Sequence, residues 1–339
     1  MKSKTNILSA AFAAAILTLL VLDPTTATLG ASEGIELCLK VLIPSLFPFI
    51  LVTTYLNAVL TGPSIPGLRP LARRLNIPAG GDSLLLLGLL GGYPVGAHLI
   101  ADAYKNNQLS KRTSQILLGY CNNAGPAFIF GVVGMLFSSK WIPFVLWLTH
   151  IISALITGIL LPRPEDDSIH AYKTSHISVV SALRKTTSVC ASICGWVVVF
   201  KIIMAYLKSW LSKQISSTGM ICISGLLELS NGCLQLDRIP TEAERLILCS
   251  AFLAFGGFCV MLQPASVTES LGLGLYFPGK MMQTSISTLI TTILSYLLFP
   301  SSPLSAYHYA SYISISILIL IAVKLYVEKK CGNSVVNHV

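Results

Sequence analysis

Charged side chains are scarce in this chain of 339 residues. Asp, Glu, Lys and Arg make up 11% of it, whereas a soluble domain carries about 25%. Hydrophobic residues make up 53%, and the mean hydropathy is +0.73. Hydrophobic segments follow one another with only short polar gaps. These proportions exclude an ordinary soluble domain and predict an all-α polytopic protein of the cell membrane, surrounded by the lipid bilayer.

Acidic residues are the scarcer charged class, with 14 Asp and Glu against 23 Lys and Arg and a net charge of +9. In a soluble protein this excess would suggest a nucleic-acid partner. In a membrane protein, Lys and Arg that hold the cytoplasmic loops explain the same excess. We therefore expect no nucleic-acid partner.

The motifs of several enzyme classes are missing. The sequence has no glycine-rich phosphate loop ending in Lys-Ser/Thr, no zinc-protease helix and no serine-elbow motif. The nine cysteines lie mostly inside apolar runs without metal-ligand spacing, and core packing explains the pair Cys190 and Cys194. We expect no enzyme, no cofactor and no metal site. Transport driven by an ion gradient, or by the gradient of the solute itself, is the default expectation.

The hydrophobic segments and their basic flanks predict the order of the chain. Residues MKSKTN precede a long apolar run, which reads as an uncleaved membrane anchor or as a cleaved secretory signal. We interpret it as an anchor followed by an outer loop, over 1–33. A first repeat over 34–161, a cytoplasmic linker over 162–187 and a second repeat over 188–299 follow. Residues 300–339 form a last transmembrane helix and a cytoplasmic tail.

Two apolar stretches of the first repeat contain helix breakers at their centres. GGYPVGA lies between two basic flanks, so its segment must enter the membrane and turn back, which predicts a hairpin tip. CNNAGP lies within a segment that crosses, which predicts an unwound middle. GLRPLARRLN, before the hairpin, reads as a short amphipathic helix on the membrane surface.

The second half repeats this plan with weak residue identity. GLLGGYPVGA resembles GLLELSNGC at 225–233, and LLGYCNNAGP resembles FLAFGGFCVM at 252–261. The two halves enter the membrane from opposite sides in this topology. The sequence therefore predicts an inverted-topology repeat with two re-entrant helical hairpins and two discontinuous helices, which is a transporter pattern.

Breaks at mid-depth expose helix ends and free carbonyls, and such groups bind solutes. A purely structural role, in which glycines allow close helix packing, is the alternative, and we favour it for Gly131 and Gly134. We expect the breaks to bind the substrate through Gly92, Tyr93, Pro94, Gly96, Asn122, Asn123, Gly125, Glu228, Ser230, Asn231, Gly256, Gly257 and Gln263.

Ionisable residues inside apolar segments are candidates for coupling to H⁺ or Na⁺. A charge at the position of Glu228 costs about 2.5–3.5 kcal/mol at a helix centre, so a cation, a proton or the substrate is expected as its partner. A position nearer the outer interface is the alternative. His98 and Asp102 lie one helical turn apart, where they form either a proton-linked pair or an ordinary hydrogen bond. For Lys40, beside Glu36, and for Lys201 a structural role is expected.

The stretches GGYPVGAHLIADAYKNNQLS, CNNAGPAFIFGVVG, PSLFPF and LELSNG resemble the sporulation integral membrane protein YlbJ/SpoVV family. This family carries the nucleoside recognition Gate domain and is similar in architecture to concentrative nucleoside transporters. The resemblance implies a transporter that moves dipicolinic acid, a small anionic solute, across the outer forespore membrane during sporulation. Gate domains also occur in ferrous iron transport proteins, so nucleoside or ion transport is an alternative. A non-transporting membrane scaffold for sporulation is another, and a homo-oligomer is left open.

Overall fold

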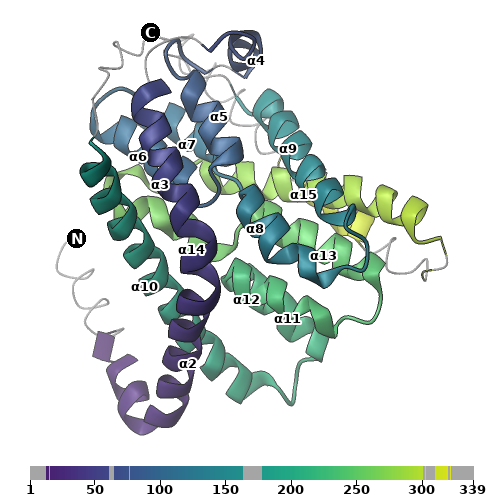
Figure 1. The fold of residues 1–339 in the computed structure, drawn as a ribbon. Helices are drawn as coiled ribbons and strands as arrows, with labels where there is room; N and C mark the ends of the chain where they lie inside the picture. Colours follow the sequence, from purple (N-terminus) through teal and green to yellow (C-terminus); the bar gives the residue numbers. More distant parts are fainter. Residues whose placement is uncertain are drawn as a thin grey trace, which may run out of the picture.

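A computed structural model of the chain describes residues 13–14, 16–60, 65–75, 77–162, 178–300, 302, 310–319 and 321. The regular structure in these residues is entirely helical (Figure 1). Within the described residues, five helices are long and apolar enough to cross a membrane. This confirms the expectation of an all-α, multi-pass membrane protein. The five are Pro24–Asn57, Ile142–Leu160, Val179–Leu211, Glu242–Ala265 and Tyr276–Leu298.

The first long helix begins where an outer loop was expected. Helix α2 (Pro24–Leu37) continues through one π-helical turn, η1 (Cys38–Leu42), into α3 (Ile43–Leu60). Asp23 accepts a hydrogen bond from the Thr26 backbone N–H, and Pro24 occupies the first turn, where its missing N–H leaves no bond unmade. Because of these start signals, residues 24–33 form a helix where a loop was expected.

Glycines hold this first helix against α10 (Val179–Leu211). A Cβ atom added at Gly30 would lie 2.8 Å from the Cα of Ile202, and one at Gly34 would lie 2.9 Å from the Cα of Val198. The two backbones therefore touch, as small residues allow inside membranes. Figure 1 shows α2, α3 and α10 together along one side of the molecule.

The remaining elements of the first half form a helical hairpin, a broken helix and one further long helix. A short helix, α4, precedes the hairpin as expected. The bounds are α4 (Arg69–Arg74), α5 (Asp82–Leu90), α6 (Val95–Lys105), α7 (Lys111–Cys121), α8 (Pro126–Gly131), η2 (Val133–Leu136) and α9 (Ile142–Leu160).

After α10 the second half shows the same order of short and long helices. Helix α15 packs against α7, α9 and α13, so it joins elements of both halves. The bounds are α11 (Ser217–Leu227), α12 (Leu229–Leu234), η3 (Leu236–Arg238), α13 (Glu242–Phe255), α14 (Gly257–Leu262), η4 (Gln263–Ser266), η5 (Glu269–Leu271) and α15 (Tyr276–Leu298).

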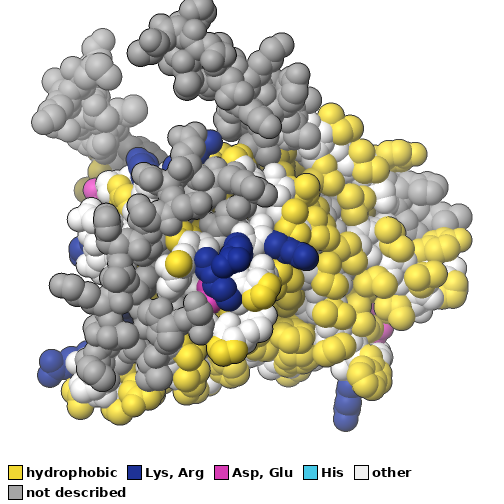
Figure 2. All heavy atoms as spheres, turned by 90° about the horizontal axis from the view of Figure 1, so that it is seen from above, with side chains coloured by type: hydrophobic (Ala, Val, Ile, Leu, Met, Phe, Trp, Pro, Cys, Tyr) yellow, Lys and Arg dark blue, Asp and Glu magenta, His cyan; other side chains and the backbone are white. Residues whose placement is uncertain are grey.

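Hydrophobic side chains cover much of the described part of the face drawn in Figure 2. The space-filling view in Figure 2 shows a broad hydrophobic area with Lys and Arg gathered near one part of it. Large apolar side chains such as Leu22, Trp141 and Leu297 are more than half exposed, which suits contact with lipid rather than water. Residues 163–177 of the expected linker, and most of the expected last transmembrane helix and tail, lie outside the described residues.

Candidate functional site

The helices are interrupted at each of the stretches singled out in the sequence. Helix α5 ends at Leu90 and α6 starts at Val95, with Gly92 in the left-handed region at φ +79° and a cis peptide bond between Tyr93 and Pro94. Residues 122–125 separate α7 from α8. Glu228 separates α11 from α12, and left-handed Gly256 (φ +81°) separates α13 from α14. We refer to these as the first, second, third and fourth breaks.

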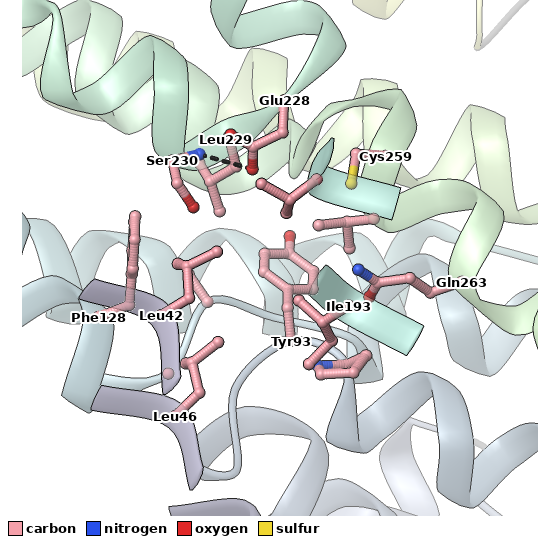
Figure 3. A pocket seen from close by; sticks show the side chains of 15 residues that line it. Leu42, Leu46, Tyr93, Phe128, Ile193, Glu228, Leu229, Ser230, Cys259 and Gln263 are labelled. Carbon is pink, nitrogen blue, oxygen red and sulfur yellow. Dashed lines mark hydrogen bonds between the residues drawn. The ribbon is translucent and has the colours of Figure 1, made fainter. Parts of the chain in front are cut away.

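Three of these breaks, and helix α14 after the fourth, contribute to one cavity of about 40 Å³ (Figure 3). Apolar side chains of η1, α3, α8 and α10, including Leu42, Leu46 and Ile193, close its other sides. The first three breaks with the residues beside them, and α14 with η4, supply its remaining walls with Tyr93, Pro94, Ala124, Gly125, Glu228, Leu229, Ser230, Cys259, Val260 and Gln263. Segments from both halves of the chain thus share one site.

The glycines let the breaks touch one another. A Cβ atom added at Gly92 would lie 3.0 Å from the Cα of Gly125, so the first and second breaks meet backbone to backbone. One added at Gly256 would lie 3.0 Å from the Tyr93 ring, and one at Gly257 would lie 3.1 Å from the backbone nitrogen of Leu229. Larger residues at these positions would force the breaks apart.

The expected site residues therefore divide into three groups. Those that line the cavity are Tyr93, Pro94, Gly125, Glu228, Ser230 and Gln263. Gly92, Gly256 and Gly257 lie at the contacts between breaks. Gly96, Asn122, Asn123 and Asn231 make contacts inside the protein. Substrate binding by all of these residues stays a prediction.

Asn122 and Asn123 hold the second break in its unwound form. The Asn122 side chain accepts a hydrogen bond from the Ala97 N–H at 3.1 Å and donates one to the Tyr276 hydroxyl at 2.8 Å. Asn123 donates to the carbonyls of Tyr120 and Gly88, at 2.6 and 3.2 Å. The two side-chain amides therefore replace helix hydrogen bonds that the break removes.

Gly96, Gly134 and Gly131 differ in how closely other residues pack against them. A Cβ atom at Gly96 would collide with the carbonyl oxygen of Cys121, at the end of α7. Gly134 lies against Pro143, as its expected packing role requires, with 3.3 Å between an added Cβ and the ring. The same expectation is wrong for Gly131, where an added Cβ would meet nothing within 4 Å.

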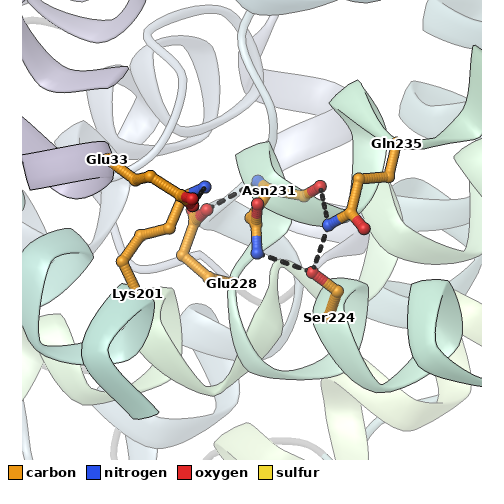
Figure 4. A network of polar contacts seen from close by, with 6 residues as sticks. All are labelled: Glu33, Lys201, Ser224, Glu228, Asn231 and Gln235. Carbon is orange, nitrogen blue, oxygen red and sulfur yellow. Dashed lines mark hydrogen bonds and ion pairs between the residues drawn. The ribbon is translucent and has the colours of Figure 1, made fainter. Parts of the chain in front are cut away.

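Glu228 is the one carboxylate that lines the cavity. It is 2% exposed, so protein surrounds the carboxylate, and its depth in the membrane stays a prediction. Both its oxygens accept hydrogen bonds, from the backbone N–H of Ser230 at 3.0 Å and of Asn231 at 2.6 Å (Figures 3 and 4). The carboxylate therefore caps α12. The cap leaves it inside the cavity wall, where an anion would be repelled and a cation or proton attracted.

The Asn231 side chain extends this polar contact away from the cavity. Its amide donates to the Ser224 hydroxyl at 2.7 Å, and Gln235 donates to the same hydroxyl at 2.8 Å (Figure 4). Lys201 lies near the N-terminal helix, with its ammonium 3.4 Å from a carboxylate oxygen of Glu33. The contacts of Asn231 and Gln235 with Ser224 fasten the third break to α11. The contact between Lys201 and Glu33 fits the structural role expected for Lys201.

Gln263 brings an unpaired polar atom to the cavity. Its side chain is 3% exposed, and its Oε1 atom has no hydrogen-bond partner in the described part of the chain. Figure 3 shows the amide beside Tyr93 and Ile193, at the edge of the cavity. An unpaired buried carbonyl oxygen is unfavourable by about 1–3 kcal/mol. A bound solute or water that donates a hydrogen bond would remove this penalty.

The ionisable residues near the hairpin are placed differently from one another. Asp102 forms an ion pair with Lys185 of α10, and both side chains are about one-third exposed. His98 lies one turn earlier on the same helix. Lys185 is therefore already paired with the carboxylate that His98 would need as its partner. A role of the His98–Asp102 pair in coupling stays a prediction. Lys40 and Glu36 pair at 2.7 Å on an exposed helix face, as expected.

The sequence analysis missed a polar group on α15 behind the cavity. Lys280 is 0% exposed, and its ammonium donates to the carbonyl of Asn122 at 2.9 Å and to the Gln283 amide oxygen at 2.7 Å. Gln283 in turn donates to Asn123. The signal was a single lysine beside an apolar run. Within the described residues, no cluster of His, Cys, Asp and Glu has the grouping of a metal site.

Comparison with known proteins gives one informative similarity. The chain is 24% identical over 347 aligned positions to the sporulation integral membrane protein YlbJ of Bacillus subtilis strain 168, and the alignment covers 86% of this chain and 83% of that protein. This confirms the predicted resemblance and supports a YlbJ-like assignment. No protein-family profile matches the chain, and no solved structure matches it.

Proposed function

We propose that this protein is a secondary membrane transporter of a small organic anion and that the cavity between the breaks is its solute site. The observation that carries the proposal is that three breaks and the helix after the fourth, from both halves of the chain, meet at one cavity with polar atoms. Irregular backbone at membrane depth is tolerated where it is enclosed by protein or lines a cavity. The similarity to a sporulation membrane protein supports sporulation as the cellular process in which the transporter acts.

The same proposal includes the finer architecture. We take α5–α6 and α11–α12 as re-entrant hairpins, and α7–α8 and α13–α14 as discontinuous helices that cross the membrane. The order of hairpin, broken helix and long helix before α10 recurs after it, ending in α9 and in α15. This order supports an inverted-topology repeat, the arrangement in which solute sites form at the interface between repeats.

Dipicolinic acid is the proposed solute, moved across the outer forespore membrane. The support is the resemblance of the motifs to the YlbJ/SpoVV family and the similarity to YlbJ. The cavity of about 40 Å³ is smaller than the roughly 150 Å³ that holds a benzene ring in an engineered protein cavity. An aromatic dianion therefore enters only when the breaks separate, so the structure corresponds to a closed state of an alternating-access cycle.

The carboxylate of Glu228 restricts how an anion can bind in this cavity. A second negative charge beside its carboxylate is unfavourable unless a proton or a cation accompanies it. Among the expected candidates Glu228, His98 and Asp102, Glu228 is the one that lines the cavity, where a proton or cation on its carboxylate would let the anion bind. The same carboxylate favours a second function, the transport of a nucleoside or a cation, because neither would be repelled by it.

Uptake into liposomes that contain the purified protein separates these functions. We expect labelled dipicolinate to accumulate, unlabelled dipicolinate to compete, and nucleosides and Fe²⁺ to leave uptake unchanged. Uptake of labelled nucleosides or Fe²⁺, with no dipicolinate flux, would support the second function. Spores of a strain that lacks the gene provide a cellular check, since the proposal requires their dipicolinate content to fall.

A further inference from the structure

Lys280 is a fully buried lysine that does not line the cavity. When protonated, its amino group has one donor for each of three acceptors: the Asn122 carbonyl at 2.9 Å, the Gln283 Oε1 atom at 2.7 Å, and the face of the Tyr93 ring, 5.2 Å from its centroid. In the described part of the chain no carboxylate forms an ion pair with it. A buried charge is normally balanced by an opposite charge, so a protonated Lys280 requires another explanation.

The acceptors form the kind of site that binds a monovalent cation. The Asn122 carbonyl is free because α7 ends at Cys121 and Asn122 is extended, with φ −119° and ψ 97°. Unwound carbonyls at broken helices are the groups that coordinate Na⁺ in transporters of this general design. An amide oxygen and an aromatic face complete a donor set for a compact cation.

The surrounding residues hold this set in place. Gln283 donates from its amide nitrogen to Asn123 at 2.7 Å, which turns its oxygen towards Lys280. Asn122 is fixed through its own side chain by Ala97 and Tyr276. Both asparagines of the second break therefore support the cation position.

We propose that the Lys280 ammonium, which is held in place by its side chain, occupies the position of a mobile coupling cation at the second break. The coupling ion is then the proton that Lys280 carries. An ammonium differs from Na⁺ in that it can release a proton, and lysine does so where arginine does not. In the cycle, Lys280 would release its proton to water on one side of the membrane and take one up from the other. This role rests on the proposed transport function, whereas the cation site itself does not.

The titratable groups that face Lys280 come from every neighbouring segment. They are Cys121 of α7, His150 of α9, Tyr93 of the first break and Tyr276 of α15 itself. His150 accepts a hydrogen bond at Nε2 from the Ala124 N–H at 3.0 Å, so its proton is on Nδ1 and the ring is neutral. Helix α13 meets α15 through the hydroxyls of Ser250 and Ser287. Lys280 is thus the basic group of this cluster that can carry positive charge.

Coupling is tested in liposomes with Lys280→Met, which keeps the length of the side chain and removes its charge. We expect the wild-type protein to concentrate labelled dipicolinate under a pH gradient and to be indifferent to replacement of Na⁺ by choline. Lys280→Met should lose concentrative uptake at least tenfold but retain counterflow exchange. Lys40→Met, at an exposed position, is the matched control. Dependence of the wild type on Na⁺, or pH-driven accumulation by Lys280→Met, would overturn the coupling role.

The cation site is tested without any transported solute. Lys280→Ala should unfold at a lower temperature than the wild type in detergent, and ammonium or methylammonium should raise that temperature relative to choline. The wild type and Lys280→Met should show no such difference, because the side chain fills the site. If ammonium fails to stabilise Lys280→Ala selectively, there is no cation site at the break. If the wild type shows neither uptake nor exchange, the transport proposal fails while this result still stands.

Discussion

Gly96→Ala tests how the hairpin is fastened to the second break. Gly96 lies in the first turn of α6, and the Cβ of an alanine there would collide with the carbonyl oxygen of Cys121 and lie 3.0 Å from the Cα of Asn122. Both obstacles are backbone, so no side-chain rotation relieves them. A Cβ atom added at Gly88 would collide with the same carbonyl oxygen, so both glycines allow this close approach.

The size of the effect follows from this geometry. Overpacking a closely packed interior costs about 1–3 kcal/mol. With an unfolding entropy of about 2.1 cal/mol/K per residue, this cost lowers the unfolding midpoint by roughly 1–4 °C in a chain of this length. Gly131→Ala is the matched control, because its Cβ would meet nothing within 4 Å. We expect it to stay within about 0.5 kcal/mol of the wild type.

Intrinsic fluorescence of the detergent-solubilised protein during heating measures both variants, and dipicolinate uptake is measured beside it. We expect Gly96→Ala to lose stability and uptake together. A variant with the wild-type midpoint and no uptake would instead show that Gly96 contacts the solute. Equal loss of stability in Gly96→Ala and Gly131→Ala would refute the packing argument.

Further predictions concern the charges and the first long helix. Asp82→Ala should reduce stability by about 3–5 kcal/mol in the same heating assay, because it leaves the Arg69 partner of a buried ion pair without its carboxylate; a loss below 1 kcal/mol would contradict this. Gly34→Val should separate the first long helix from α10 and lower the midpoint, and an unchanged midpoint would show that the contact is dispensable. Glu228→Gln should reduce uptake about tenfold or more, because a charge-assisted hydrogen bond is worth about 1.5–3 kcal/mol. Wild-type uptake by this variant would remove Glu228 from the mechanism.

Local sequence was sufficient to locate the breaks. Gly92 and Gly256 adopt left-handed conformations that only glycine takes readily, and Pro126 begins the helix that follows the second break. Glu228 sits before two backbone N–H groups, as a capping residue does. Each of these features depends on residues close together in the sequence, so pattern and residue type predict it.

Contacts between distant residues could not be predicted in this way. Lys280 reaches Asn122 across 158 positions, and Tyr93 reaches Leu253 across 160. Whether an asparagine lines the cavity or fastens a break depends on such partners, and Asn122, Asn123 and Asn231 all make internal contacts. The outer loop was expected because it follows the anchor, but capping by Asp23 and glycine packing against α10 favour helix there.

Equilibrium binding of labelled dipicolinate to the purified protein tests most directly whether the cavity is the solute site. Leu46→Trp places a large ring in the cavity wall, and Leu56→Trp makes the same change further along α3, at a side chain that is 40% exposed. The account predicts that Leu46→Trp abolishes binding and that Leu56→Trp binds as the wild type does. Wild-type binding by Leu46→Trp, in a protein that unfolds at the wild-type temperature, would contradict it.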